Sequence, residues 1–422
     1  MKNKEILKVI RNKNFLIYSF AQTISLIGDK LNHMALIALV KVFAFGHSLA
    51  FSHLAFFFTL PAIIFGPIAG VIADRMDRKS ILVFGDITRA ILVILIPLSV
   101  MFFNHLLPVY ILVFFAFLIG ILYNSAKMAI IPSLLRSTSE ILAANSILTS
   151  TGRLGTVVGL FIGGLIVDWE MWRRFRIEGW QAGFYLDALT FFVSGLFLML
   201  LVVPDHRRES KREHLAHLIL EREKNYFQKT IRDLKEALKL ILKDKNVSFV
   251  LFSLLVLVFL GATVYILIVI VVQQFLDYGT TGVGKLGALT AFGMAIGAFF
   301  FGTFGDKWDR KSVIIYSFFL LSLILIIFPF LKKFFYIGIV SFSGGLLLSP
   351  VMISQDTLLH ENVPPELRGR IFASKELLLN GAFLLISYPF GILAEWIYPA
   401  KIILFNGIIL FVLTLFFFLK MR

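Results

Sequence analysis

The chain has 422 residues, of which 58% are hydrophobic, 15% aromatic and only 16% charged. A soluble globular protein needs more charge than this to cover its surface, so the composition excludes that class and predicts an integral membrane protein. The formal net charge of +15 is consistent with membrane topology and attraction to lipid headgroups, and the absence of cysteine excludes disulfides and cysteine-ligated metals.

Apolar runs of about 20 residues are long enough to cross about 30 Å of hydrocarbon, and such runs fill both halves of the chain. In the first half they lie at residues 14–45, 49–73, 81–103, 108–132, 140–167 and 183–203. In the second half they lie at residues 247–276, 282–304, 312–331, 334–357, 370–397 and 400–420. The twelve runs predict an all-α membrane protein of two pseudo-symmetric six-helix bundles, at residues 1–203 and 247–422.

The polar stretch between the bundles, residues 204–246, is expected to be a cytoplasmic linker. Its apolar residues recur at helical spacing and predict an amphipathic helix on the membrane surface or against the bundles: Phe227, Ile231, Leu234, Leu238 and Ile241. Lys and Arg are concentrated on the loops that share a side with the N-terminus, which predicts a multi-pass protein of the inner (plasma) membrane with both termini in the cytoplasm. A basic, aromatic outer loop at 172–176 predicts a short helix in the headgroup layer.

One charged segment occurs twice, at residues 70–80 after the second run and at 302–312 after the eighth run. Its acidic residues recur in register, and membrane orientation does not explain this because acidic residues contribute little to it. Parallel repeats of this kind are typical of two-halved transporters with a site at their midline. We expect the two copies to form a gating latch that holds the inner side shut, with these residues: Gly70, Asp74, Arg75, Asp77, Arg78, Lys79, Asp306, Lys307, Asp309 and Arg310.

The first copy resembles the conserved loop motif of the major facilitator superfamily, with Asp77 where many members have Gly, and the resemblance covers essentially the whole chain. It implies twelve helices in two halves that rock about a central cavity. Within the superfamily the chain is similar to the branch that holds macrolide exporters and the enterobactin exporter, through Ile27-Gly28-Asp29, Ser125-Ala126-Lys127 and Ala144-Asn145. Lys127 replaces the Arg of that branch, and the Lys form is equally similar to the bacterial lysophospholipid transporter.

The fifth run carries small residues at a spacing that lets two helices touch backbone to backbone in lipid: Gly155, Gly159, Gly163 and Gly164. We therefore expect a helix-packing face there. The same pattern resembles the antiporter motif of exporters in the superfamily, with Leu160 where that motif has Pro, and so implies export rather than import. Without the Pro, the helix should be less kinked at this point.

The first run carries Asp29 and Lys30 near the bilayer centre, where each charge costs roughly 2.5–3.5 kcal/mol. A polar stripe with helical spacing surrounds them and must face the protein interior or water: Gln22, Ser25, Asp29 and His33. We predict that Asp29 and Arg153, in the middle of the fifth run, face the central cavity, and that Asp29 is the main proton-titrating group. The alternative is a permanent ion pair of Asp29 with Lys30 or Arg153. For His33 the alternative is a structural, hydrogen-bonded role.

The remaining candidates are weaker. Asp86 and Arg89, three residues apart on one helix, are expected to form a local pair. Three polar residues are candidate contacts to a substrate or a lipid headgroup: Lys127, Tyr265 and Gln355. The alternative for Lys127 is a contact to Asp74. With 46 Phe in the chain we expect an aromatic cavity suited to amphipathic or hydrophobic substrates.

These features predict a secondary transporter, most simply a proton-coupled exporter (antiporter) of lipophilic or amphipathic small molecules by alternating access. One alternative is a flippase for lysophospholipid or another lipid, and an alternative of another class is a non-transporting receptor or scaffold. The near phosphate-loop at residues 279–286 ends in Leu286 where Ser or Thr must bind magnesium, so ATP hydrolysis is not expected. The chain has no HExxH or GxSxG motif, so we expect no enzyme activity.

The expected partners follow from this function. They are a small-molecule or lipid substrate, protons and membrane lipids, without nucleic acid, metal or other cofactor. Because both halves lie in one chain, we expect a monomer.

Overall fold

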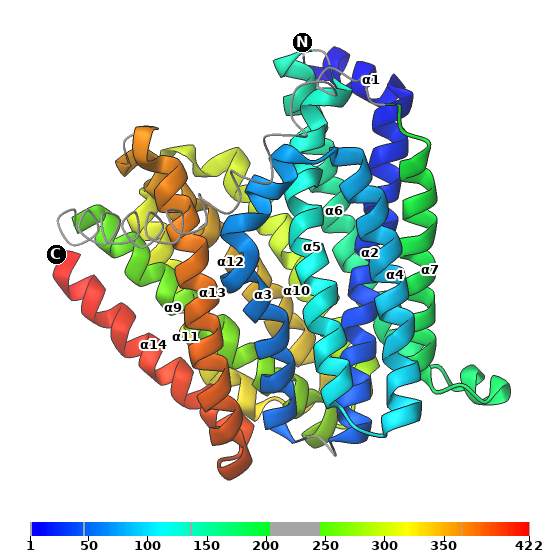
Figure 1. Ribbon diagram of the computed structural model, residues 1–422. Coiled ribbons are helices and arrows are strands. Elements are labelled where there is room, and N and C mark those ends of the chain that lie inside the picture. The colour runs from blue at the N-terminus through cyan, green and yellow to red at the C-terminus, as the bar shows by residue number, and fades with distance from the viewer. Residues whose placement is uncertain (1, 45–46, 136, 203–244, 364, 422) are drawn as a thin grey trace.

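Every regular element of the described residues is a helix (Figure 1), which confirms the expected all-α fold. The computed structural model describes residues 2–44, 47–135, 137–202, 245–363 and 365–421. The linker and amphipathic helix predicted at residues 204–246 lie outside these ranges, apart from the last two positions, which open the first helix of the second half.

The first half contains a short N-terminal helix, six long helices and one 3₁₀ turn. In chain order they are α1 (Lys2–Arg11), α2 (Lys13–Phe43), α3 (Ser48–Arg75), α4 (Arg78–Phe103), α5 (Leu107–Leu134), α6 (Thr138–Val167), η1 (Glu170–Phe175) and α7 (Gly179–Met199). The turn η1 falls on the basic loop for which a short helix was expected.

The second half repeats this plan with six long helices. They are α9 (Lys245–Ile270), continued by the π-helical turn η2 (Val271–Phe275), then α10 (Gly279–Phe304), η3 (Gly305–Lys307), α11 (Arg310–Ile327), η4 (Phe328–Phe330), α12 (Phe334–Asn362), α13 (Pro365–Trp396) and α14 (Pro399–Met421). Eleven helices of the described residues are long and apolar enough to cross a membrane. The remaining long helix, α2, has 31 residues and carries Asp29 and Lys30 in its middle.

The duplicated charged segment starts the third long helix of each half. Asp77 precedes α4, and its carboxylate accepts a hydrogen bond from the backbone N of Ser80 at 2.9 Å. Asp309 precedes α11 and accepts from the backbone N of Ser312 at 2.8 Å. Each carboxylate thus satisfies a backbone donor of a first helical turn that has no partner inside the helix. The in-register Asp residues therefore have a local role in beginning two helices.

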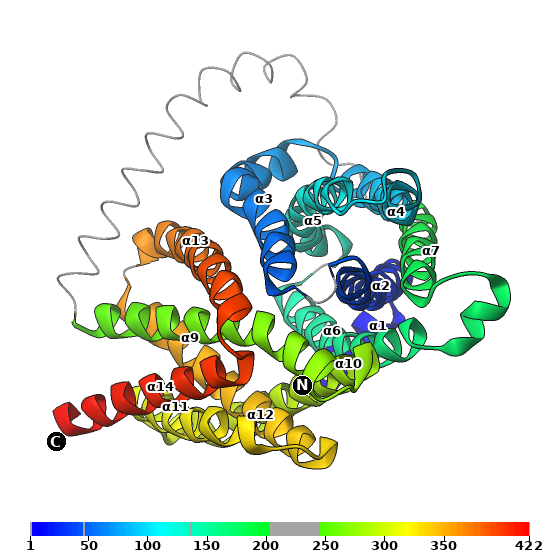
Figure 2. The same cartoon turned by 90° about the horizontal axis from the view of Figure 1, so that it is seen from below.

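The two halves contact each other mainly through two pairs of helices, α6 with α10 and α3 with α13 (Figure 2), and α9 and α10 make smaller contacts with α3 and α2. We call the end where α3 and α10 begin the gate end, and the opposite end, which carries α1, Asp77 and Asp309, the basic end. The largest apolar cluster crosses between the halves near the gate end, where residues 34–40 of α2 and Phe51 of α3 pack with Ile266 and Ile270 of α9. Towards the basic end the ribbons of the two halves diverge (Figure 1).

The glycines of α6 lie at its closest helix contacts. A Cβ at Gly159 would stand 2.8 Å from Cβ of Lys30 and 3.0 Å from the carbonyl oxygen of Ile27, both on α2. A Cβ at Gly163 would stand 3.0 Å from Cγ of Met34. Gly164 faces the other half, since its Cβ would stand 3.1 Å from Cα of Gly284 on α10.

Candidate transport site

A buried charge cluster lies inside the first half, where α2, α4, α5 and α7 meet. At its centre Arg89 of α4 forms an ion pair with Asp86, whose side chain is fully buried. Nη1 of Arg89 also lies 3.6 Å from Oδ1 of Asp29 on α2. The exposed fraction of the side chain is 44% for Asp29, 7% for Arg89 and 0% for Asp86. Asp29 is therefore the member of the cluster that a proton or solute can reach.

Neutral groups complete the surroundings of Asp86. Its Oδ2 accepts hydrogen bonds from Ser194 Oγ of α7 at 2.6 Å and from the hydroxyl of Tyr123 of α5 at 3.3 Å. Ser25 Oγ of α2 lies 3.5 Å from its Oδ1. A carboxylate held by this many donors is locked in place, which a fully buried charge requires.

Two aromatic rings enclose the guanidinium group of Arg89. Its Cζ atom lies 4.2 Å from the ring centroid of Tyr123 and 4.2 Å from that of Phe191. Cation–π contacts of this geometry stabilise a desolvated cation. Arg89 is thus fixed between two rings with one carboxylate on each side, the buried Asp86 and the half-exposed Asp29.

Lys127 of α5 belongs to the same cluster. It interacts electrostatically with Asp29, Arg89 and Asp86, and its carbonyl oxygen accepts a hydrogen bond from the hydroxyl of Tyr18 at 2.8 Å. The sequence had suggested Lys127 as a contact to Asp74, to a substrate or to a lipid headgroup. Gln22 is tied in as well, because its Nε2 lies 2.5 Å from the hydroxyl of Tyr123.

A third buried carboxylate, Asp187 of α7, was missed by the sequence reasoning. It is fully buried, and its Oδ2 accepts a hydrogen bond from Asn32 Nδ2 of α2 at 2.7 Å. Gly28 leaves room for it, because a Cβ at Gly28 would overlap Asp187 and Thr190. The signal was available in the sequence, since Asp187 is the single charged residue within α7 and carries the same burial cost as Asp29.

Arg153 does not form the ion pair with Asp29 that the sequence left open as an alternative. Its side chain is exposed on α6, and among the described residues it has no hydrogen bond or ion pair, whereas Asp29 faces Arg89. Lys30 is half-buried, against the glycine face of α6. Of the predicted cavity residues, the structure brings together Gln22, Ser25 and Asp29, joins them to α4 and α5, and leaves Arg153 apart.

An aromatic group bridges the two halves beside this cluster. The ring of His33 on α2 lies 5.6 Å from that of Tyr265 on α9. Phe58 of α3 lies 6.0 Å from Tyr265 and 6.4 Å from Phe383 of α13. We call these four residues, His33, Phe58, Tyr265 and Phe383, the aromatic bridge. The hydroxyl of Tyr265 is buried and has no hydrogen-bond partner among the described residues.

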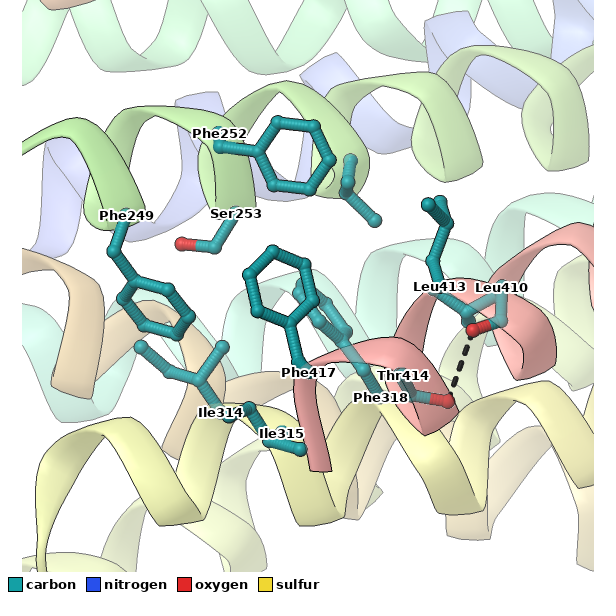
Figure 3. A pocket seen from close by; sticks show the side chains of 11 residues that line it. Phe249, Phe252, Ser253, Ile314, Ile315, Phe318, Leu410, Leu413, Thr414 and Phe417 are labelled. Atoms are coloured by element: carbon teal, nitrogen blue, oxygen red, sulfur yellow. Dashed lines mark hydrogen bonds between the residues drawn. The ribbon is translucent and has the colours of Figure 1, made fainter. Parts of the chain in front are cut away.

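In the second half the polar groups are sparser. Gln355 is fully buried, with Nε2 donating to Ser253 Oγ at 3.0 Å and Oε1 without a partner among the described residues. Lys375 pairs with Asp356, whose side chain is 52% exposed. The cavity in Figure 3, between α9, α11 and α14, is lined by apolar side chains with Ser253 and Thr414 and holds about 20 Å³. That is room for a water molecule, far below the volume of an organic substrate.

The described latch residues make contacts within their own half. Arg78 donates to the carbonyl oxygen of Ala129 at 2.6 Å, and Lys79 to those of Met199 and Leu201 at 2.8 Å. Arg310 donates to the carbonyl oxygen of Gly305 at 2.6 Å, and Lys307 is exposed. The side chains expected at Asp74, Arg75 and Asp306, and the packing expected at Gly70, lie outside the described residues.

Comparison with known proteins agrees with this architecture. The family model of the Major Facilitator Superfamily matches residues 18–374 and 251–422. Macrolide efflux protein A of Streptococcus pyogenes is 22% identical over 90% of this chain and 88% of its own length. The putative bacilysin exporter BacE of Bacillus subtilis strain 168 is 25% identical over 86% of this chain and 84% of its own.

A solved structure shares the fold. The bacterial homologue of the human lysosomal transporter Spinster, in its inward-facing and unoccupied conformation, superposes with a TM-score of 0.65 at 15% identity, covering 90% of this chain and 82% of that one. Two six-helix halves, a charged hinge repeated between the second and third helices of each, and a family match over most of the sequence lead to one conclusion: the chain belongs to the Major Facilitator Superfamily and is a membrane transporter.

Proposed function

We propose that this transporter is a proton-coupled exporter of lipophilic or amphipathic small molecules. The observation that carries the proposal is the unequal burial of the two carboxylates beside Arg89. Asp86 is fully buried and held by Ser194 and Tyr123. The Asp29 side chain is 44% exposed and approaches Arg89 only at Nη1, at 3.6 Å. Asp86 can therefore stay paired while Asp29 gains and loses a proton.

The aromatic bridge supplies the surface for a substrate. Its rings come from both halves, so a molecule bound against them contacts α2 and α3 on one side and α9 and α13 on the other. Aromatic faces with a single unpartnered hydroxyl, that of Tyr265, suit a mostly apolar molecule with one polar group. The relatives named as macrolide efflux protein and bacilysin exporter support an outward direction of transport.

Coupling then follows from the cluster's position. Protonation of Asp29 removes one of the two negative charges next to Arg89 and so changes the charge that the first half presents beside the aromatic bridge. A substrate and a proton that favour different charge states of Asp29 exclude each other, which is the requirement for antiport. The basic end is cytoplasmic in this proposal, because Lys and Arg gather there. The conformation with contacts at the gate end is then open to the cytoplasm, and the latch closes the basic end in the opposite state.

The test uses purified protein in liposomes with an imposed pH gradient and an internal pH dye. The panel contains cationic drugs, macrolides and a lysophospholipid. The variants are Asp29→Asn and, as a matched removal of an exposed carboxylate, Glu170→Gln. We expect drug-triggered proton flux in the wild type and in Glu170→Gln, and none in Asp29→Asn.

Other outcomes contradict the proposal in distinct ways. Drug-triggered proton flux that persists in Asp29→Asn removes the assigned proton carrier. Movement of lysophospholipid independent of the gradient identifies a lipid flippase. Binding of a partner protein without movement of any solute identifies a receptor or scaffold.

A further inference from the structure

We propose that Asp168 and Glu395 are paired gate residues, each of which caps the first turn of a helix in the opposite half, so that both caps must break before the gate end opens. The inference rests on the alternating access of the proposed function, but on neither its substrate nor its proton. It concerns the end opposite the duplicated latch, at which the sequence reasoning assigned no gate residues.

Glu395, near the end of α13, caps the start of α3. Its Oε1 accepts hydrogen bonds from the backbone N of Leu49 at 3.0 Å and from Ser48 Oγ at 2.8 Å. Its Oε2 lies 2.8 Å from Nδ1 of His47. Ser48 Oγ also lies 2.8 Å from the carbonyl oxygen of Gly391, one turn before Glu395. A carboxylate of the second half thus supplies the cap that α3 lacks within its own half.

Asp168, directly after α6, caps the start of α10 in the same way. Its Oδ2 accepts from the backbone N of Thr281 at 2.5 Å. Thr281 Oγ1 donates to the carbonyl oxygen of Gly164 at 3.0 Å, again one turn before the carboxylate. Gly279, with φ +62, keeps the approach open, because a Cβ there would stand 2.8 Å from Oδ2 of Asp168. The side chain at the start of α10 offers no cap of its own.

The two caps are copies of one device under the symmetry of the halves. Both carboxylates end the fifth long helix of a half, and both receiving helices are the second long helix of the other half. Leu49 and Thr281, the backbone donors, are separated by the same number of residues as Gly70 and Gly302. Each carboxylate lies four residues after a glycine whose carbonyl oxygen lies within 3.0 Å of a hydroxyl at the start of the receiving helix, that of Ser48 before the donor Leu49 and that of the donor Thr281 itself. An accidental contact would not occur at both interfaces together with a glycine carbonyl and a hydroxyl beside it.

The physical consequence is a pair of contacts that exist in one state alone. The first N–H groups of a helix have no partner in that helix and carry the positive end of its dipole, so a carboxylate there stabilises the helix start. Because donor and acceptor belong to different halves, rocking the halves apart separates them. Replacing a capping carboxylate by Ala removes a stabilisation that corresponds to about a fivefold change in equilibrium constant. The two sites share no partner, so their effects on the open-to-closed ratio should multiply.

The chain is suited to a direct test because it contains no cysteine. Spin labels on Phe103→Cys and Lys333→Cys, both exposed at the gate end on opposite halves, report the distance between the halves. The measurement is the distance distribution by pulsed electron paramagnetic resonance in lipid nanodiscs. Asp168→Ala and Glu395→Ala are tested singly and together, with Asp168→Asn and Glu395→Gln as conservative variants that keep an acceptor oxygen.

Ser137→Ala is the matched control, because Ser137 Oγ caps α6 by accepting a hydrogen bond from the backbone N of Glu140, and both residues belong to the same half. We expect each single Ala variant to raise the population with the longer distance about fivefold relative to the closed one, the double variant to show roughly the product, and the Asn and Gln variants to lie between wild type and Ala. Ser137→Ala should leave the distribution unchanged.

An unchanged distribution in the double variant overturns the inference, as does a shift equal to that of Ser137→Ala. Size-exclusion profiles identify a variant that fails to fold, and the conservative variants then provide the test. The distance measurement needs no substrate. If the distance between the halves changes as expected but the protein transports no solute, the proposed function is refuted, whereas the role of Asp168 and Glu395 in closing the gate end is retained.

Discussion

Replacing Arg89 by Ala should destabilise the protein far more than replacing Asp29 by Ala, although the two residues face each other. Arg89→Ala leaves Asp86 charged, fully buried and without a cation, with Ser194, Tyr123 and Ser25 as its remaining donors. Asp29→Ala leaves Arg89 paired with Asp86. The two substitutions therefore separate the buried half of the cluster from its exposed half.

The magnitudes follow from burial. Removing one partner of a buried ion pair costs about 3–5 kcal/mol. The lost contacts of Arg89 with the rings of Tyr123 and Phe191 add about 0.5–2 kcal/mol each. The pair between Arg89 and Asp29 spans 3.6 Å with a half-exposed carboxylate, and exposed pairs contribute about 0–1 kcal/mol. We expect a difference of at least about 3 kcal/mol between the two variants.

The assay is thermal unfolding of purified protein in detergent, followed by the loss of the monodisperse size-exclusion peak. A difference of 3 kcal/mol corresponds to a gap of roughly 5 °C in apparent Tm for a chain of this size, extrapolating from smaller domains. The double variant Asp86→Ala/Arg89→Ala should be more stable than the sum of the two single variants implies, because it removes both buried charges. Equal stability of Arg89→Ala and Asp29→Ala, or strict additivity in the double variant, would refute the argument.

Three further predictions concern packing, the aromatic bridge and the repeated hinge. Gly159→Val should lower the free energy of unfolding by about 1–3 kcal/mol, because the new side chain pushes α6 away from Lys30 and Ile27 of α2; the measurement is a lower melting temperature. The control Gly302→Ala should leave the melting temperature unchanged, because a Cβ at Gly302 meets no atom within 4 Å. Tyr265→Phe should keep or raise the melting temperature, because it removes a buried hydroxyl without a partner, yet raise the KM for an exported substrate that bonds this hydroxyl; an unchanged KM for every substrate would exclude that contact. Backbone and side-chain hydrogen bonds from Ser312 hold the pKa of Asp309 below its usual value. The stabilisation of the folded protein by the ionised Asp309 cap is therefore present above the unfolded-state pKa of about 3.9 and is lost as the pH falls through the lower folded-state pKa. Asp309→Ala should therefore cost about 1 kcal/mol at pH 7, and its difference from wild type in melting curves should shrink in acid; a constant difference would contradict the cap.

The site shows where sequence reasoning reached its limit. The cost of a mid-membrane charge drew attention to Asp29, and the structure places Asp29 in a charge cluster. The same argument placed Arg153 at the central cavity and left an ion pair of Asp29 with Lys30 or Arg153 as the alternative, but the cation that faces Asp29 is Arg89. Arg89 and Arg153 both lie on helices that could face α2, and the rotation of α4 and α6 about their axes decides between them.

The sequence by itself determined the number and approximate bounds of the membrane runs, the presence of two related halves and the polar stripe on α2. These features depend on residues within a few positions of each other, such as Asp77 and Ser80 at the start of α4. The tertiary structure alone decided the partners of Asp29, the burial of Asp187 and the caps that Asp168 and Glu395 provide across the halves. Contacts between residues that lie far apart in the chain depend on helix rotation and crossing. Close packing of many side chains sets both, and no local pattern encodes them.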